Sequence, residues 1–283
     1  MVNQETVIEA PSSSKSASYP KFKLGETLTD EQIAFFDKHG FIHFDGYATK
    51  AEVEELLNAL KEVQARWVNE NVEKVNGTPI KYGTDVDGSK IVHRFAFTSL
   101  HSERFHQFAN SPRLKTLKKL LPKGARIAEN EKDGVVVNHY LNSENSNFRN
   151  MGWHTDSLRD VFLGKKIMPM LNIGFYFDDS SEDKGGLRII PGTHKQGLFG
   201  MLFKKMYFLN NEVDKEEVLV SAKAGDLVIH DGRIWHRVAR SPYLGEKSRR
   251  RVMYFPMIVG KYQPKDENSK TPIYHYLQRI VGK

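Results

Sequence analysis

Hydrophobic positions recur at helical spacing in the N-terminal third of the chain. One side of a helix over Lys50–Asn69 would carry Val53, Leu56, Leu57, Leu60, Val63 and Trp67. Upstream, Thr29–Phe36 begins like a capped helix with acidic residues in its first turn, and Gly40 is suited to end it. Phe41–Phe44 is a short apolar run typical of a strand. The pattern therefore predicts two helices with a strand between them.

From about residue 130 the chain changes to short apolar runs separated by glycine, proline and aspartate. We expect strands over Val135–Tyr140, Met168–Phe177, Leu187–Ile190, Val218–Ala222, Leu227–His230 and Arg250–Val259. Turns are expected at Gly185-Gly186, Pro191-Gly192, Gly225-Asp226 and Asp231-Gly232. Many short strands in series favour a mainly β fold, a sandwich or jelly roll, with the N-terminal α-helices flanking it.

The domain organisation follows from the same pattern. Residues 1–19 are polar and poor in large apolar groups, so they are expected to form a flexible tail. The remaining residues 20–283 are expected to form a single domain, with a helical part over 28–130 and the β core over about 131–260. The chain has 283 residues, of which 39% are hydrophobic, enough for one large buried core.

Composition excludes several classes of protein. The chain has no cysteine, which excludes disulfides, thiolate zinc sites and cysteine nucleophiles and suits a reducing compartment. It has no run of about 18 apolar residues, and Met1–Lys23 lacks the hydrophobic core of a secretory signal. We therefore expect a cytoplasmic protein without a membrane span.

The net charge of +7 does not by itself identify a partner. Lysines at 115, 118, 119 and 123 alternate with leucines in the manner of a solvated helix face. Basic and aromatic residues do not interleave as they do in proteins that bind single strands. We expect a small-molecule substrate and no nucleic acid, and the sequence does not indicate an oligomeric state.

One group of residues has the composition of a metal site. His154-Thr155-Asp156 is followed 80 residues later by His236, and two histidines with one carboxylate form the facial triad that binds non-haem ferrous iron. Two similar triplets, His43-Phe44-Asp45 and His101-Ser102-Glu103, show that the triplet alone proves little. Context has to distinguish them.

The context of each histidine favours His154. His43 lies within an apolar run and is expected to be structural, and His101 lies in a polar, helix-like stretch. His154 follows a predicted strand and a polar loop, and ligands one residue apart on an extended segment project to the same face. As the third ligand we prefer His236 to His230, which continues an apolar run. The alternative, that His154, Asp156 and His236 are ordinary structural residues, stays open on spacing alone.

Longer motifs carry a resemblance to a known family. They are Gly152-Trp153-His154-Thr155-Asp156, the run from Gly185-Gly186 to Pro191-Gly192-Thr193-His194, and Gly225-Asp226-Leu227 leading to His236. Together with Leu28–Gln32 and Gly40-Phe41, these motifs resemble the phytanoyl-CoA dioxygenase family of iron(II)- and 2-oxoglutarate-dependent oxygenases over about residues 28–260. The resemblance implies a double-stranded β-helix, a cupin-like jelly roll.

The resemblance also implies roles for individual residues. His154, Asp156 and His236 would be the iron ligands, whereas His194 would be structural. An arginine after the second histidine would bind the distal carboxylate of 2-oxoglutarate, because its planar fork engages both oxygens. Among Arg249, Arg250 and Arg251 we favour Arg250, with Arg249 as the second choice. Asn138, Tyr140 and Asn172 would contact the same co-substrate.

The implied activity is oxidation of an unactivated C–H bond of a small molecule, with O2 as the other co-substrate and succinate and CO2 as products. Hydroxylation, desaturation and cyclisation remain open, while halogenation is disfavoured because Asp156 is present. We expect a secondary-metabolite or lipid-like substrate, anionic or apolar. The alternatives are a non-catalytic jelly-roll binding module and a zinc-dependent hydrolase at the same triad.

Two further segments have more than one interpretation. Residues 197–215 begin with a run rich in aromatic and flexible apolar groups, which would serve either as a lid over an apolar substrate or as an extra packing layer. Arg159, just after the triad, would either meet an anionic substrate or lie on the surface.

Overall fold

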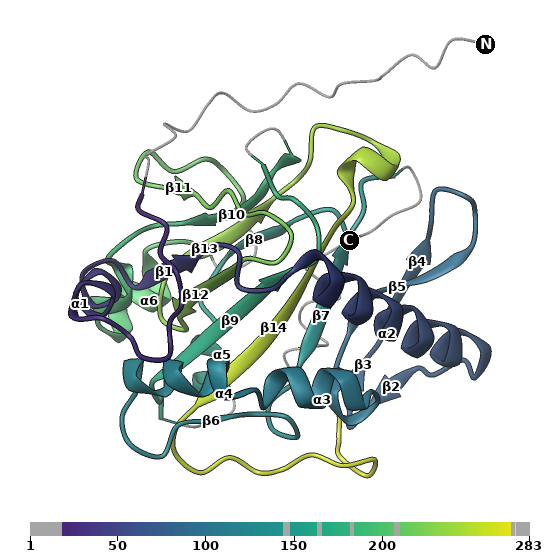
Figure 1. The fold of residues 1–283 in the computed structure, drawn as a ribbon, viewed down its shortest axis with the longest axis horizontal. Coiled ribbons are helices and arrows are strands. Elements are labelled where there is room, and N and C mark those ends of the chain that lie inside the picture. The colour runs from purple at the N-terminus through teal and green to yellow at the C-terminus, as the bar shows by residue number, and fades with distance from the viewer. Residues whose placement is uncertain are drawn as a thin grey trace.

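The computed structural model describes residues 19–143, 148–162, 166–181, 184–206, 210–272 and 275. The expected flexible tail therefore lies outside the described residues, apart from Tyr19. Within these ranges the chain is mainly β with flanking helices, as the hydrophobic pattern predicts. Figure 1 shows the helices α2 (Lys50–Asn69) and α3 (Glu103–Ala109) in front of the larger of two sheets.

The larger sheet has eight strands, and all of its neighbouring strands are antiparallel. Its order is β1 (Phe41–Phe44), β12 (Leu227–Asp231), β9 (Met170–Tyr176), β14 (Arg250–Ile258), β7 (Val136–Tyr140), β5 (Lys90–Phe95) and β4 (Lys81–Thr84), and β6 (Arg126–Ile127) also pairs with β14. Strands β4, β5 and β6 come from the part of the chain that we expected to be helical. Their runs are too short or too polar to stand out in the sequence.

The smaller sheet has the order β11 (Val218–Leu219), β10 (Gly186–Ile189), β13 (His236–Ala239) and β8 (Met151–His154). A separate hairpin pairs β2 (Lys74–Val75) with β3 (Thr78–Pro79). The register between β13 and β8 places His236 directly opposite His154. The fold thus brings together two histidines that are far apart in the sequence.

The helices begin where the sequence indicates. Helix α1 (Asp30–His39) has a capping box between Thr29 and Gln32 and ends at Gly40, whose φ of 76° suits glycine. Helix α2 has the same arrangement between Thr49 and Glu52. The remaining α-helices among the described residues are α3, α4 (Pro112–Lys115), α5 (Leu158–Phe162) and α6 (Leu198–Phe203). The lysine-rich segment after α4 continues as a 3-10 helix, Thr116–Leu120.

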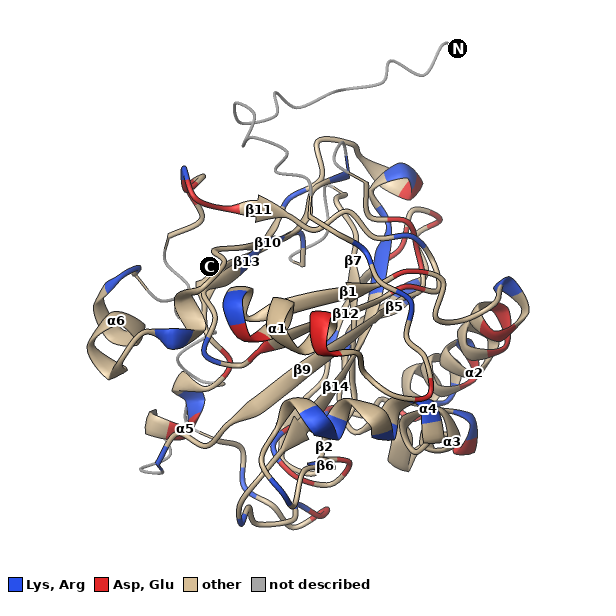
Figure 2. Cartoon of the chain, turned by 60° about the vertical axis from the view of Figure 1, so that its left-hand side comes forward, with Lys and Arg blue, Asp and Glu red and all other residues tan. Residues whose placement is uncertain are grey.

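Two layers of apolar side chains hold the fold together. The larger core fills the space between the helices and the large sheet and includes Leu56, Trp67, Phe105, Phe175 and Phe255. The smaller core includes residues of both sheets, among them Phe41, Tyr176, Leu187, Ile189, Val228 and Val252. Figure 2 shows that α2 carries residues of both charges, while strands β9 and β14 are mainly uncharged. This burial fixes the sheets around the polar residues described below.

Among the described residues, no helix has both the length and the hydropathy that crossing a membrane would require.

Candidate active site

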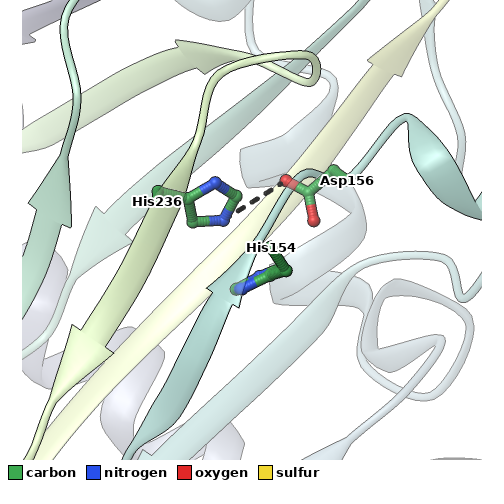
Figure 3. Close-up of side chains that lie close together, drawn as sticks. All are labelled: His154, Asp156 and His236. Carbon is green, nitrogen blue, oxygen red and sulfur yellow. Dashed lines mark ion pairs between the residues drawn. The ribbon is translucent and has the colours of Figure 1, made fainter. Parts of the chain in front are cut away.

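The structure brings His154, Asp156 and His236 together. Each of these buried residues offers one ligand atom, and the three atoms lie within 4.8 Å of one another. Figure 3 shows the side chains directed toward one another, with His154 at the end of β8, Asp156 just after it and His236 at the start of β13. His236 Nε2 lies 3.8 Å from Asp156 Oδ2. Among the described residues this is the one such cluster that could hold a metal ion.

Backbone carbonyls orient both imidazoles. His154 Nδ1 lies 2.8 Å from the carbonyl oxygen of Gly152, and His236 Nδ1 lies 3.1 Å from that of Ile234. When Nδ1 carries the proton and donates it to a carbonyl, Nε2 keeps its lone pair for a metal. The local chain thus selects the tautomer that a metal ligand requires.

The carboxylate of Asp156 is held by two further side chains. Asn172 Nδ2 donates to Asp156 Oδ2 over 2.8 Å, and His230 Nε2 lies 3.2 Å from the same oxygen. His230 and Asn172 are direct neighbours on strands β12 and β9. His230, the alternative third ligand in the sequence, therefore contacts the carboxylate and is not part of the three-residue cluster.

The electrostatics of the cluster favour the protonation states of a metal site. Burial lowers the pKa of His154, and burial together with the neighbouring histidines holds the pKa of His236 well below its usual value. Burial opposes ionisation of Asp156, but the electrostatic effect of the neighbouring His236 and the hydrogen bond with His230 outweigh it and keep the pKa of Asp156 well below its usual value. The arrangement supplies neutral imidazoles and an ionised carboxylate.

Three consecutive arginines at the start of β14, of which Arg249 directly precedes the strand, have different partners. Arg251 is paired with Asp178 through two hydrogen bonds of 2.8 and 2.7 Å, and Arg249 is paired with Asp85 and Glu246. Arg250 is 3% exposed and has no acidic partner among the described residues. One of its nitrogens donates to the carbonyl of Ala239 over 3.0 Å, and its buried Nε has no hydrogen-bond partner there.

A buried cation without an anion is costly, so the surroundings of Arg250 indicate a place for an anionic ligand. Its guanidinium lies 5.4 Å from the ring centre of Tyr140, its direct neighbour on β7. Gly186 leaves room for this side chain, because a Cβ at that position would lie 3.3 Å from Arg250 Nη1 and 2.4 Å from Ser180 Oγ. Close packing against Arg250 and Ser180 therefore explains why glycine occurs at position 186 of the Gly185-Gly186 motif.

Three polar side chains of β7 and β14 line a cavity next to the cluster. Asn138 Nδ2 donates to the hydroxyl of Tyr140 over 3.3 Å, and Asn138 Oδ1 is buried without a partner among the described residues. Burial raises the pKa of Tyr140 to about 12 and that of Tyr254 well above its usual value. Both phenols are therefore protonated near neutral pH and can donate a hydrogen bond to a ligand.

The cavity has a volume of about 650 Å³ and receives residues from both sheets. Its lining includes His154, Asp156, His236 and Asn172. It also includes Asn138, Tyr140 and Tyr254, whereas Arg250 is not part of the lining and lies next to Tyr140. Six of the seven residues that the sequence nominated for the site thus share one cavity.

Other residues considered in the sequence have different surroundings. His43 is fully buried between Tyr19 and Asp226, at 3.0 and 2.9 Å, which agrees with the expected structural role. His194 Nε2 lies 2.9 Å from the carbonyl oxygen of Asp37 in α1. Neither histidine belongs to the metal-binding cluster. Arg159 lines the cavity, so of its two interpretations the surface position is wrong.

The segment expected to be a lid or a packing layer contains α6. Phe199, Phe203 and Met206 are strongly exposed, whereas Met201 is buried. None of residues 197–206 lines the cavity, although Asn211 does. Residues 207–209 of this segment lie outside the described residues.

Sequence reasoning did not find several cavity residues. Arg94, Lys132 and Asp133 line the cavity, and Tyr254 does as well. Alternation along β14 places Tyr254 on the face of Arg250 and is a signal that could have identified it. No local pattern marks the other three: Lys132 and Asp133 are consecutive, and Arg94 on β5 meets them only in the folded chain.

The donor set fits a ferrous ion. Two imidazole nitrogens and one carboxylate oxygen are the ligands of non-haem iron(II) sites that leave positions for co-substrates. The hydrogen bonds to the outer side of each imidazole and to the carboxylate are those expected around a metal. The buried Arg250, whose Nε has no hydrogen-bond partner among the described residues, fits an anionic co-substrate beside it.

Comparisons with known proteins agree with this chemistry. The sequence profile of the family described as Phytanoyl-CoA dioxygenase (PhyH) matches residues 36–250. A rice protein (Oryza sativa subsp. japonica) named Phytanoyl-CoA dioxygenase 1 is 23% identical over 248 residues, which cover 75% of this chain and 83% of the relative. A Dictyostelium discoideum protein named Phytanoyl-CoA dioxygenase domain-containing protein 1 homolog is 25% identical over 254 residues, which cover 74% and 84%.

A solved structure shows the same fold. The epimerase SnoN, in complex with Fe3+, alpha ketoglutarate and nogalamycin RO, aligns with a TM-score of 0.59 at 18% identity, covering 83% of this chain and 86% of SnoN. The expected double-stranded β-helix is thereby confirmed. Because the family profile spans most of the chain and its motifs occur in order, this chain belongs to the phytanoyl-CoA dioxygenase family of iron(II)- and 2-oxoglutarate-dependent oxygenases.

Proposed function

We propose that His154, Asp156 and His236 bind the ferrous ion and that Arg250 binds the distal carboxylate of 2-oxoglutarate. The single observation that carries the proposal is the pairing of a buried His-Asp-His cluster with a buried arginine that lacks an acid among the described residues. Asn138 and Tyr140 line the cavity together with the cluster, and the ring of Tyr140 is next to Arg250. They are proposed to contact the co-substrate, and Asn172 does so or acts through Asp156.

The proposed reaction is the oxidation of an unactivated C–H bond of a small molecule, by hydroxylation, desaturation or cyclisation. In hydroxylation, one atom of O2 enters the substrate and the other enters succinate, while CO2 is released. A cavity of about 650 Å³ supports a small-molecule substrate. The names of the relatives, which refer to phytanoyl-CoA and to nogalamycin, support a lipid-like compound or a secondary metabolite.

When bound, iron(II) with 2-oxoglutarate supplies the oxidant, and the protein supplies orientation and exclusion of water. His154 and His236 present Nε2 because their Nδ1 atoms face carbonyl oxygens. Asn172 and His230 fix the carboxylate of Asp156. The protonated phenol of Tyr140 and the buried guanidinium of Arg250 favour an anionic ligand beside them.

Asp156 narrows the chemistry further. On bound iron, a carboxylate at this position would occupy the place that a chloride ligand needs, so halogenation is disfavoured. This carboxylate is buried and accepts two hydrogen bonds, which makes its displacement by a halide unfavourable.

The test is an anaerobic titration of the purified protein with iron(II) and 2-oxoglutarate. Bidentate binding of the keto acid to iron(II) is expected to give a visible charge-transfer band. His154→Ala and Asp156→Ala should abolish the band, whereas His106→Ala should not, because His106 is half exposed and pairs with Glu129 outside the cavity. A band that persists in Asp156→Ala would overturn the ligand assignment.

A turnover assay distinguishes the proposed oxygenase from the two alternatives, a non-catalytic binding module and a zinc-dependent hydrolase. Incubation with iron(II), 2-oxoglutarate, ascorbate and a metabolite extract should release succinate and give products that gain oxygen or lose two hydrogens, measured by mass spectrometry. A band without succinate release from any extract would indicate a non-catalytic binding module. Activity with zinc and without 2-oxoglutarate would indicate a hydrolase.

A further inference from the structure

A second group of cations, which does not include Arg250, lies at the same cavity. Asp133 is 2% exposed and lies between two arginines: its Oδ2 accepts from Arg94 over 3.0 Å and from Arg159 over 3.1 Å. Lys265 Nζ lies 3.6 Å from its other oxygen. The arginines come from β5 and α5, so the carboxylate joins segments that are distant in the sequence.

The cations of this group outnumber the acids. Lys132 Nζ lies 2.9 Å from Asp160 Oδ1, and its side chain is only 6% exposed. Four cations, Arg94, Arg159, Lys132 and Lys265, thus face three carboxylates, Asp133, Asp160 and Asp156, among the described residues. Figure 2 shows a basic and an acidic segment side by side at α5. Within these seven side chains the cations exceed the carboxylates by one.

This excess faces the cavity. Arg94, Lys132 and Arg159 all line it, and Arg94 Nη1 is buried without a hydrogen-bond partner among the described residues. Burial lowers the pKa of Lys132, and the charge of Arg159 lowers it further. Crowded cations with an unused donor are unfavourable without an anion, and a guanidinium fork matches a carboxylate or a phosphate.

The group is also next to the metal-binding cluster. Arg159 Nη2 lies 4.0 Å from Asp156 Oδ1, and its Nε donates to the carbonyl of Asp156 over 3.3 Å. A ligand held by Arg94 and Arg159 would therefore share the cavity with the iron site. Arg250 is packed against the ring of Tyr140, is not among these cations and can serve the co-substrate separately.

We propose that Arg94 and Arg159 bind an acidic group of the substrate, a carboxylate or a phosphate, and that Asp133 positions both arginines for it. This inference rests on the proposed oxygenase function, whose substrate class it specifies. Lys132 adds positive charge to the same wall. A neutral analogue would leave the cations without an anion and should bind poorly.

The test uses three probes of equal chain length: octanoate, octyl phosphate and the neutral octanamide. Binding to the full-length protein loaded with iron(II) and 2-oxoglutarate is measured anaerobically by calorimetry. At least one of the two anions should bind about tenfold or more tightly than octanamide, because the amide cannot form charge-assisted hydrogen bonds. The anion that binds more tightly identifies the acidic group.

Variants test the residues. Arg94→Gln should weaken binding of the preferred anion by about tenfold or more, and Arg94→Lys should weaken it less because the charge remains. Arg126→Gln is the matched control, since Arg126 also pairs with an acid, Glu131, but does not line the cavity. Thermal unfolding of each variant shows whether it is folded.

Two outcomes would overturn the inference: octanamide binding as tightly as the anions, or no measurable binding of either anion at millimolar concentration. An Arg94→Gln variant that is folded and binds the anion normally would also do so. The band of iron(II) with 2-oxoglutarate reports the proposed function independently. A normal band without anion binding rejects only the substrate class, and loss of the band in Arg94→Gln would assign these arginines to the co-substrate.

Discussion

Arg249, Arg250 and Arg251 show how the surroundings of one side-chain type decide its role. The outer two are neutralised by acids, and Arg250 alone of the three lacks an acidic partner among the described residues. Alternation along a strand places the side chain of Arg250 on the opposite face from those of Arg249 and Arg251. It does not show on which face acidic partners lie. The acids come from three other segments, at Asp85, Asp178 and Glu246.

Replacing Arg250 should therefore affect the co-substrate specifically. Arg250→Gln is expected to raise the Kd for 2-oxoglutarate by about a hundredfold, because charge-assisted hydrogen bonds contribute about 1.5–3 kcal/mol. The measurement is the titration of the iron(II)/2-oxoglutarate band. Arg251→Gln is the control and should leave the Kd nearly unchanged. An equal increase of the Kd for 2-oxoglutarate in both variants would show that the effect is not specific to Arg250.

Asn172 has two interpretations that one experiment separates. It donates to Asp156 Oδ2, so Asn172→Ala should weaken iron(II) affinity by about tenfold, as is usual for residues that orient a metal ligand. The affinity for 2-oxoglutarate, measured at saturating iron(II), should change less. The reverse result would indicate that Asn172 contacts the co-substrate directly, as the family resemblance implies.

Helix α6 is an element whose two faces differ sharply. Phe199 is 76% and Phe203 67% exposed, whereas Met201 is 4% exposed. The carbonyl oxygen of Gly200 accepts from the indole of Trp235, directly before His236. The helix is thus attached to the strand that carries a proposed ligand, while its aromatic face contributes little to packing.

This difference predicts opposite effects of substitution on stability. Met201→Ala should lower the free energy of unfolding by about 2–3 kcal/mol, since it removes buried apolar atoms and leaves a cavity. Phe199→Ser should change it by less than about 0.5 kcal/mol, as is usual for exposed positions. Urea denaturation measures both values. A comparable decrease in the free energy of unfolding for both variants would mean that the aromatic face of α6 is packed against other residues in solution.

The molecule as a whole contains buried histidines outside the site, and His139 on β7 is one of them. Arg249 donates to its Nε2 over 2.7 Å. Burial, together with the charges of Arg249 and Arg251, holds the pKa of His139 well below its usual value of 6.5. In the unfolded chain this histidine binds a proton below about pH 6.5, whereas in the folded chain it does not.

Folding stability should therefore fall as the pH decreases below about 6.5. The contribution of this group is at most about 1.4 kcal/mol per pH unit. The free energy of unfolding, measured by urea at pH 7.5 and 5.5, should decrease less in His139→Gln than in the wild type, because glutamine keeps polar groups but does not titrate. Equal decreases would show that His139 is protonated in the folded protein.

How much could be predicted from the sequence differs between parts of the molecule. Helices α1 and α2 and strands β7, β9, β12 and β14 were predicted closely, because capping residues and apolar periodicity act between near neighbours. Strands β4 and β5 were not, because both contain polar residues; they pair with each other, and only β5 also pairs with the distant strand β7. The division into a tail over residues 1–19 and one domain over residues 20–283 stays a prediction.

The capped helices, the alternating strands and the ligand types at His154, Asp156 and His236 follow from the amino-acid sequence alone, since these depend on neighbours in the chain and on motifs in fixed order. That Arg250 lacks an acid among the described residues and that Asp133 joins Arg94 to Arg159 became apparent from the folded chain. Such pairings depend on distances between residues far apart in the chain. Local periodicity contains no information about those distances, and packing of the two sheets and their helices fixes them.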